Sequence, residues 1–135
     1  LKESRLKVKD ADDVELGSVE RSGARYKLKV AASGEAYEFQ RQADGDWKFK
    51  AGDEQLIYRV KPRDYGYEIE SPDDRSLAKI KRKDDKLSVR DADDKTRLYT
   101  KDDLPDLAAV PFGFERLADI RLRAALAAML ADPQR

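Results

Sequence analysis

The chain has 135 residues, of which 41% are charged, and its 28 lysines and arginines balance its 28 aspartates and glutamates. A net charge of zero argues against nucleic-acid binding, because proteins that bind nucleic acid generally carry a basic excess. Cysteine and histidine are both absent, which excludes disulfides, thiol chemistry and the commonest metal ligand and general base. The charges alternate with apolar and aromatic residues, so we expect one folded domain over residues 1–135.

Most of the chain repeats with a period of about 20 residues. Related segments begin at Val8, Leu28, Phe49, Ile69 and Val89. Each holds a central cluster of turn-forming residues, and the hexapeptides VKDADD and VRDADD, which begin the first and fifth copies, differ at a single position. A unit of this length with a turn at its middle is typical of a β-hairpin and its connection.

The repeat predicts about ten strands, and their residues alternate between apolar and charged. Tyr26, Leu28 and Val30, for example, alternate with Lys27 and Lys29. The predicted strands are 4–9, 14–20, 25–31, 36–42, 46–50, 55–60, 65–70, 76–82, 86–90 and 96–100. Short connections make them an antiparallel meander with one apolar and one solvated face. Ten such strands rarely stay flat, so we expect residues 4–100 to close into a barrel.

The C-terminal stretch 112–131, FGFERLADIRLRAALAAMLA, is predicted to be one helix, joined to the barrel by a connector at 101–111. Glu115, Asp119 and Arg123 form a polar side in its first half, and from Ala124 onward the helix is apolar all round. A helix that is apolar on every side is enclosed by protein or lipid. A ten-strand barrel is wider than its own side chains can fill. We therefore predict a mainly β fold closed around a hydrophobic C-terminal helix.

A meander of hairpins with Asp/Gly turns that ends in a hydrophobic helix resembles the tubby C-terminal, LURP-one and phospholipid-scramblase superfamily. The resemblance covers most of the chain, but it rests on the order of elements and not on an invariant motif. It implies a barrel around a central helix, although the family usually has twelve strands. Eukaryotic members bind phosphoinositides or are linked to membranes. No residue matches a family lipid site, so the resemblance implies a fold and no site.

Three acidic clusters could ligate calcium or cap turns. They are Asp10/Asp12/Asp13, Asp73/Asp74 and Asp91/Asp93/Asp94. None has the spacing of an EF-hand loop, and aspartate side chains commonly bond the backbone of β-turns. We therefore favour turn formation, and we predict no metal site and no cofactor.

Two further groups have alternative interpretations. The basic residues Lys61, Arg63, Lys79, Lys81, Arg82 and Lys83 could bind an anionic surface, but a solvated sheet face that protects against edge pairing is the simpler interpretation. The aromatic residues Tyr37, Phe39, Trp47, Phe49, Tyr58, Tyr65 and Tyr67 could line a ligand pocket, but aromatic residues on alternating strands usually pack in the core.

Arg121 is the one residue of the predicted helix that is hard to place. It lies opposite Glu115, Asp119 and Arg123 and among alanines, so we expect it to be buried against the barrel wall. A buried charge must be paired, so Arg121 is either a structural clamp or part of a site. No pair of carboxylates stands out in an apolar setting, so no catalytic residue is predicted.

The predicted function is a non-enzymatic structural or interaction module. Its exterior would bind a membrane surface, a lipid headgroup or a protein partner, and nucleic acid is not expected. The alternative is a lipocalin-like or fatty-acid-binding-like carrier of a small apolar ligand, in which the helix would pack outside and the aromatic residues would line a cavity. The chain has no predicted transmembrane segment, and because it begins at Leu1 we expect a processed or lipid-anchored bacterial envelope protein in preference to a cytoplasmic one.

Overall fold

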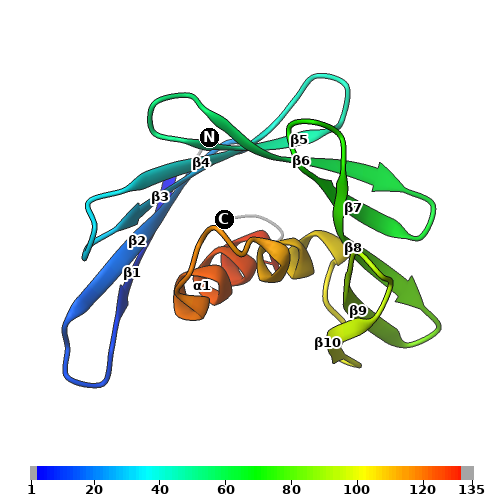
Figure 1. Ribbon diagram of the computed structural model, residues 1–135. Coiled ribbons are helices and arrows are strands. Elements are labelled where there is room, and N and C mark those ends of the chain that lie inside the picture. The colour runs from blue at the N-terminus through cyan, green and yellow to red at the C-terminus, as the bar shows by residue number, and fades with distance from the viewer. Residues whose placement is uncertain (1–2, 132–135) are drawn as a thin grey trace.

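The computed structural model describes residues 3–131, which form ten β-strands, one 3-10 helix and one α-helix (Figure 1). The strands are β1 (Glu3–Lys9), β2 (Glu15–Ser22), β3 (Arg25–Val30), β4 (Ala36–Arg41), β5 (Trp47–Ala51), β6 (Leu56–Arg63), β7 (Gly66–Glu70), β8 (Ser76–Lys83), β9 (Lys86–Asp91) and β10 (Thr96–Thr100). The 3-10 helix η1 spans Asp106–Gly113, and α1 spans Ile120–Ala131. The ten strands predicted from the repeat are all present, with ends shifted by at most three residues.

The strands form a single antiparallel sheet in sequence order, which confirms the predicted meander. Figure 1 shows the sheet curving around η1 and α1, which lie on its concave side. Closure into a barrel is not observed: within residues 3–131 each strand pairs only with its neighbours in sequence, and β1 and β10 are the two edges of the sheet. The expected closed barrel is therefore an open, curved sheet with a gap between its first and last strands.

The repeat corresponds to a turn whose hydrogen bonds recur. At the tip between β1 and β2, the Asp10 N–H donates to the Val14 carbonyl and the Asp13 N–H donates to the Asp10 carbonyl, both at 3.0 Å. The same two bonds recur in the turns that begin at Ala51, Ser71 and Asp91. In these turns the fourth residue has a positive φ, between 64° and 70°: Asp13, Glu54, Asp74 and Asp94. Aspartate tolerates this conformation better than most residues, which explains why the turns are rich in it.

The apolar faces of the strands meet on the concave side around Phe114. Its ring stacks on those of Phe49 and Tyr58, with centroid separations of 4.5 and 5.1 Å. The Phe39 ring meets it edge-on, with the centroids 5.4 Å apart. The Arg116 N–H donates to the Tyr58 hydroxyl oxygen at 2.9 Å, and burial raises the pKa of Tyr58. Of the aromatic residues expected in the core, Tyr37, Phe39, Trp47, Phe49 and Tyr58 are buried, whereas Tyr65 and Tyr67 are partly exposed.

The prediction of one helix over 112–131 is wrong at its start, because α1 begins at Ile120. Gly113 ends η1, and the chain then places Phe114 in the core before it turns again. Asp119 stops the helix from extending backward: its carboxylate accepts a hydrogen bond from the Arg121 N–H at 2.9 Å, and its carbonyl accepts one from the Leu122 N–H. This is how an N-cap residue satisfies the first free amides of a helix.

The expected connector at 101–111 is partly core. From Asp106 it forms η1, which buries Ala108, Ala109, Val110 and Pro111. One arginine holds this connector in place, and a second holds the residues that follow it. Arg82 of β8 donates to the Asp106 carboxylate at 2.8 Å and to the Leu104 carbonyl, and Arg123 of α1 donates to the Leu117 carbonyl at 2.6 Å and to the Phe112 carbonyl.

The α1 helix packs closely against the N-terminal part of the sheet. A side-chain carbon added at Gly17 of β2 would lie 2.1 Å from the Lys29 carbonyl oxygen of β3 and 2.9 Å from the Leu122 side chain, so only glycine fits between β3 and α1 here. Leu122, Leu126, Met129 and Leu130 are all buried, as expected for a core helix. The stripe formed by Ile120, Ala124 and Ala128 is exposed. The expectation that the end of the helix is enclosed on every side is therefore wrong for this stripe.

We predict that Leu126→Asp abolishes folding or destabilises the protein by more than about 4 kcal/mol, because an unpaired carboxylate would be buried at a position with no solvent exposure. Thermal unfolding followed by circular dichroism measures the effect. Ala124→Asp is the matched control, since Ala124 lies half a turn away on the exposed stripe and should change stability by less than about 1 kcal/mol. Equal melting temperatures for the two variants would contradict the packing of α1.

Candidate functional site

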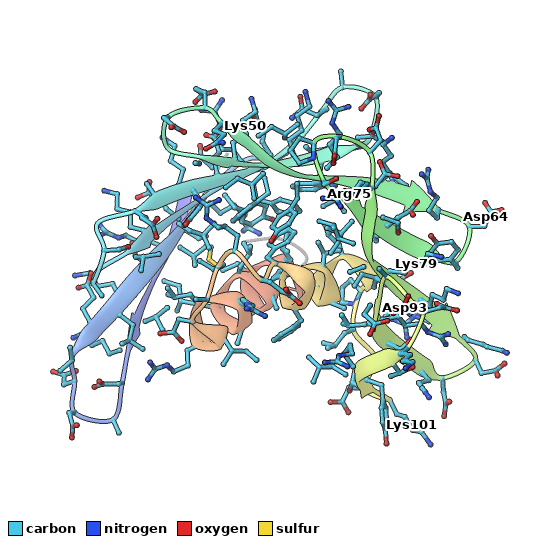
Figure 2. All side chains as sticks on the ribbon, in the orientation of Figure 1. Lys50, Asp64, Arg75, Lys79, Asp93 and Lys101 are labelled. Carbon is cyan, nitrogen blue, oxygen red and sulfur yellow. The ribbon has the colours of Figure 1, made fainter. Side chains whose placement is uncertain are left out.

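The basic residues predicted on the outer sheet face are largely paired with carboxylates. Lys61 contacts Glu70 at 3.1 Å, Arg63 contacts Glu68 at 3.0 Å, and Lys81 contacts Asp94 at 3.0 Å. Burial alone would raise the pKa of Glu68, but the hydrogen bond from Arg63 helps to lower it. This supports a solvated, charge-paired face and gives no collected patch for an anionic surface. Figure 2 shows the labelled residues Lys50 and Asp64 on the outer side of the sheet, away from α1.

The acidic clusters act in turns, as predicted. The Asp10 carboxylate accepts hydrogen bonds from the Asp12 and Val14 N–H groups, and the Asp91 carboxylate does the same for Asp93 and Lys95, all at 2.9–3.0 Å. In residues 3–131 we find no group of three or more acidic side chains arranged to hold a metal ion.

Arg121 is exposed, so the expected buried charge is wrong. Its Nε and Nη2 donate to the two carboxylate oxygens of Asp119 at 3.0 Å each, and this hydrogen bonding lowers the pKa of Asp119. Because α1 begins at Ile120, Arg121 lies in the first turn of the helix, beside the N-cap residue Asp119. Arg121 therefore belongs to the capping arrangement, whereas the partly buried arginine of α1 is Arg123.

An apolar groove lies between α1, η1 and the last two strands, with a volume of about 470 Å³. The sheet contributes Leu87 and Val89 of β9 and Leu98, Tyr99 and Thr100 of β10. The helix contributes Ile120, Ala124, Ala127, Ala128 and Ala131. The segment between them contributes Leu104, Ala108, Ala109 and Phe112. None of these lining residues carries a charge at neutral pH.

The groove collects three of the exposed large apolar side chains. Of the six such side chains in the described part of the chain, Leu98, Leu104 and Ile120 enter it, and Ile120 is 54% exposed. Tyr99 of β10 also borders the groove, but it is opposite Ser88 in the register and the Lys86 ammonium lies 4.8 Å from its ring centroid, so its ring is on the other face of the sheet. Single exposed apolar residues are ordinary, but a gathered set marks a surface that binds something.

A second hollow adjoins the groove at Leu98 and Phe112, and it is charged. It is lined by Arg90, Asp91, Arg97, Glu115 and Arg123, among others. Asp91 holds its own turn and pairs with Arg97 at 3.8 Å, and Arg123 bonds backbone carbonyls. Asp91, Arg97 and Arg123 thus have structural partners, so the charged hollow is a weaker candidate for a site than the apolar groove.

Sequence reasoning missed the groove because it treated the end of the helix as enclosed. The available signal was the spacing of Ile120, Ala124 and Ala128, which places three apolar residues on one side of a helix whose large leucines lie on another. The exposed residues of β10 could not be distinguished from core residues by their alternation alone.

No protein-family profile matches the chain, and no curated protein or solved structure is significantly similar to it. None of the helices in residues 3–131 is both long enough and apolar enough to cross a membrane.

We predict that Asp119→Ala destabilises the protein by about 1 kcal/mol at pH 7, because it removes the helix cap, whereas Asp119→Asn retains most of the cap. Because the pKa of Asp119 is lowered in the folded state, its charge stabilises the fold above the unfolded pKa of about 3.9 and this contribution is lost as pH falls. Denaturant unfolding at pH 7 and pH 3 tests both points. If the difference in stability between the wild-type protein and Asp119→Asn were larger at pH 3 than at pH 7, the stabilising role of the Asp119 charge would be contradicted.

Proposed function

We propose that this domain is a non-enzymatic interaction module, and that its contact surface is the apolar groove between α1 and β10. The observation that supports it is the concentration of exposed apolar side chains in one groove whose lining residues carry no charge. Binding there would remove apolar area from water at roughly 25 cal/mol per Å². Such a surface provides affinity, and Tyr99 and Thr100 are the hydroxyl-bearing residues of its lining.

A protein partner fits this groove better than the other exterior ligands expected from the sequence. A lipid headgroup or an anionic membrane surface would need a collected cationic patch, and Lys61, Arg63 and Lys81 of the outer face are paired with carboxylates. The groove is bordered by an edge strand on one side and by the exposed stripe of α1 on the other. An apolar protein segment lying between them would contact both sides.

A carrier of a small apolar ligand is the second candidate. The groove volume of about 470 Å³ lies within the range of small-molecule sites, roughly 300–1,000 Å³. Such a ligand would bind on the exterior, since the aromatic residues of the sheet pack against Phe114. This differs from a lipocalin-like arrangement, in which those residues would line an internal cavity.

Membership of the tubby-like superfamily remains a proposal that rests on architecture. The ten-strand meander and the C-terminal helix on its concave side agree with the resemblance. In a closed barrel of that kind the groove would be covered.

The proposed groove is tested with the neutral dye Nile red, whose fluorescence rises in apolar surroundings. We expect saturable binding to the wild-type protein and a loss of about tenfold or more in affinity for Ala128→Arg, which places a charge in the groove from an exposed helix position. Ala11→Arg, in the exposed turn between β1 and β2, is the control and should bind normally. Equal binding by wild type and Ala128→Arg would contradict the proposal.

A further inference from the structure

The free edge of β10 lies beside the apolar groove. Among the described residues β10 pairs only with β9, so its other side has no strand partner. Leu98 and Thr100 are opposite Val89 and Leu87 in the register, and these two β9 residues are buried on the concave side. A strand added to β10 would therefore direct alternate side chains into the groove, toward the exposed stripe of α1.

The charges along the two edges of the sheet limit what can pair there. Lys95, Arg97 and Lys101 are the charged residues in and beside β10, and Asp94 and Asp102 lie immediately outside this stretch. Arg97 already pairs with Asp91 at 3.8 Å. In the register that would pair all of β10 with a second copy of itself, Lys95 would lie opposite Lys101. Like charges directly opposite each other destabilise a strand pair, so β10 is poorly suited to pair with itself.

Pairing of β10 with the other edge strand of a second copy meets the same obstacle. That strand, β1, contains Arg5, Lys7 and Lys9. Basic edge residues are a common protection against such sheet-to-sheet association. Edge protection accounts for the charges, but it does not account for the exposed Leu98 beside an apolar groove.

We infer that the groove and the β10 edge together bind an extended acidic peptide by strand addition. The peptide would have apolar residues at alternate positions, which enter the groove, and carboxylates at the positions between them, which face Lys101 and its basic neighbours. Backbone hydrogen bonds to β10 would provide affinity, and the alternate side chains would provide specificity. This inference rests on the proposed function, because it uses the same groove.

The test uses a fluorescein-labelled peptide, Glu-Val-Glu-Leu-Glu-Val-Glu, with blocked ends, and measures fluorescence anisotropy with the full chain. Successive N–H groups of a strand point to opposite edges, so two N-methylated versions are informative. One is methylated at the glutamates and the other at the apolar residues. Strand addition predicts that one version loses about tenfold or more in affinity, since several backbone hydrogen bonds are lost, while the other binds nearly as well as the parent.

Two charge controls accompany this test. Replacing the glutamates of the peptide with lysines should weaken binding, and Lys101→Glu should reduce the preference for the glutamate peptide. Lys48→Glu on β5, which is distant from β10 in the sheet order, should leave the preference unchanged. An unchanged preference in Lys101→Glu would overturn the acidic character of the partner.

The outcomes separate this inference from the proposed function. Equal affinity for both N-methylated peptides, with loss of binding in Ala128→Arg, would overturn strand addition and leave the groove as a contact surface for apolar groups. Absence of binding by the parent peptide, with normal Nile red binding, would overturn the peptide partner and favour a small apolar ligand. If the wild-type protein bound neither Nile red nor the parent peptide, the proposed function itself would be overturned.

Discussion

The insertion of Phe114 into the aromatic lining of the curved sheet is the contact on which the other contacts depend. Its ring stacks on Phe49 and Tyr58, and the backbone just beyond it bonds the Tyr58 hydroxyl. Loss of a fully buried phenylalanine side chain typically costs about 3–5 kcal/mol, a large share of the stability of a small domain. A ten-strand sheet this curved cannot fill its concave side with its own side chains, so the C-terminal segment is part of the core.

This arrangement also determines where the apolar groove lies. Because Leu122, Leu126 and Leu130 face the core, the opposite stripe of α1 must face the gap in the sheet. In a closed barrel that stripe would be covered, but β1 and β10 do not pair. The groove is thus a consequence of an apolar helix on the concave side of an open sheet. An exposed stripe of alanines beside a free edge strand is suited to the close approach of another backbone.

The strands were predictable because their signal is local. Alternating residues identify each strand, and turns with an aspartate or glutamate at positive φ fix where strands end, as at Asp13 and Asp94. The C-terminal helix was predictable in its second half, where Leu126 and Leu130 are buried as expected. Its start was misplaced because Asp119 has the same spacing from Glu115 and Arg123 that a surface helix would have, although it acts as the N-cap.

The groove and the open sheet depend on long-range geometry, which residue patterns do not contain. Whether β10 meets β1 depends on strand twist and curvature summed over the whole sheet, and no single residue specifies it. Ala124 is exposed and Ala125 is buried because they lie on different sides of α1, and the residue type alone does not indicate which side faces the sheet. Arg121 was misplaced because its environment was inferred from neighbours on a helix that begins later than predicted.

Native-state amide hydrogen exchange tests most directly whether the C-terminal segment is part of the core. If Phe114 and α1 complete the core, the slowest amides of α1 should exchange with the same free energy of opening as those of β4 to β6, because both would open only in global unfolding. The protein contains a single tryptophan, Trp47, which lies in this core and reports global unfolding independently. Rapid exchange throughout α1 while β4 to β6 remain protected would show that the sheet is stable without the helix, and it would contradict this account.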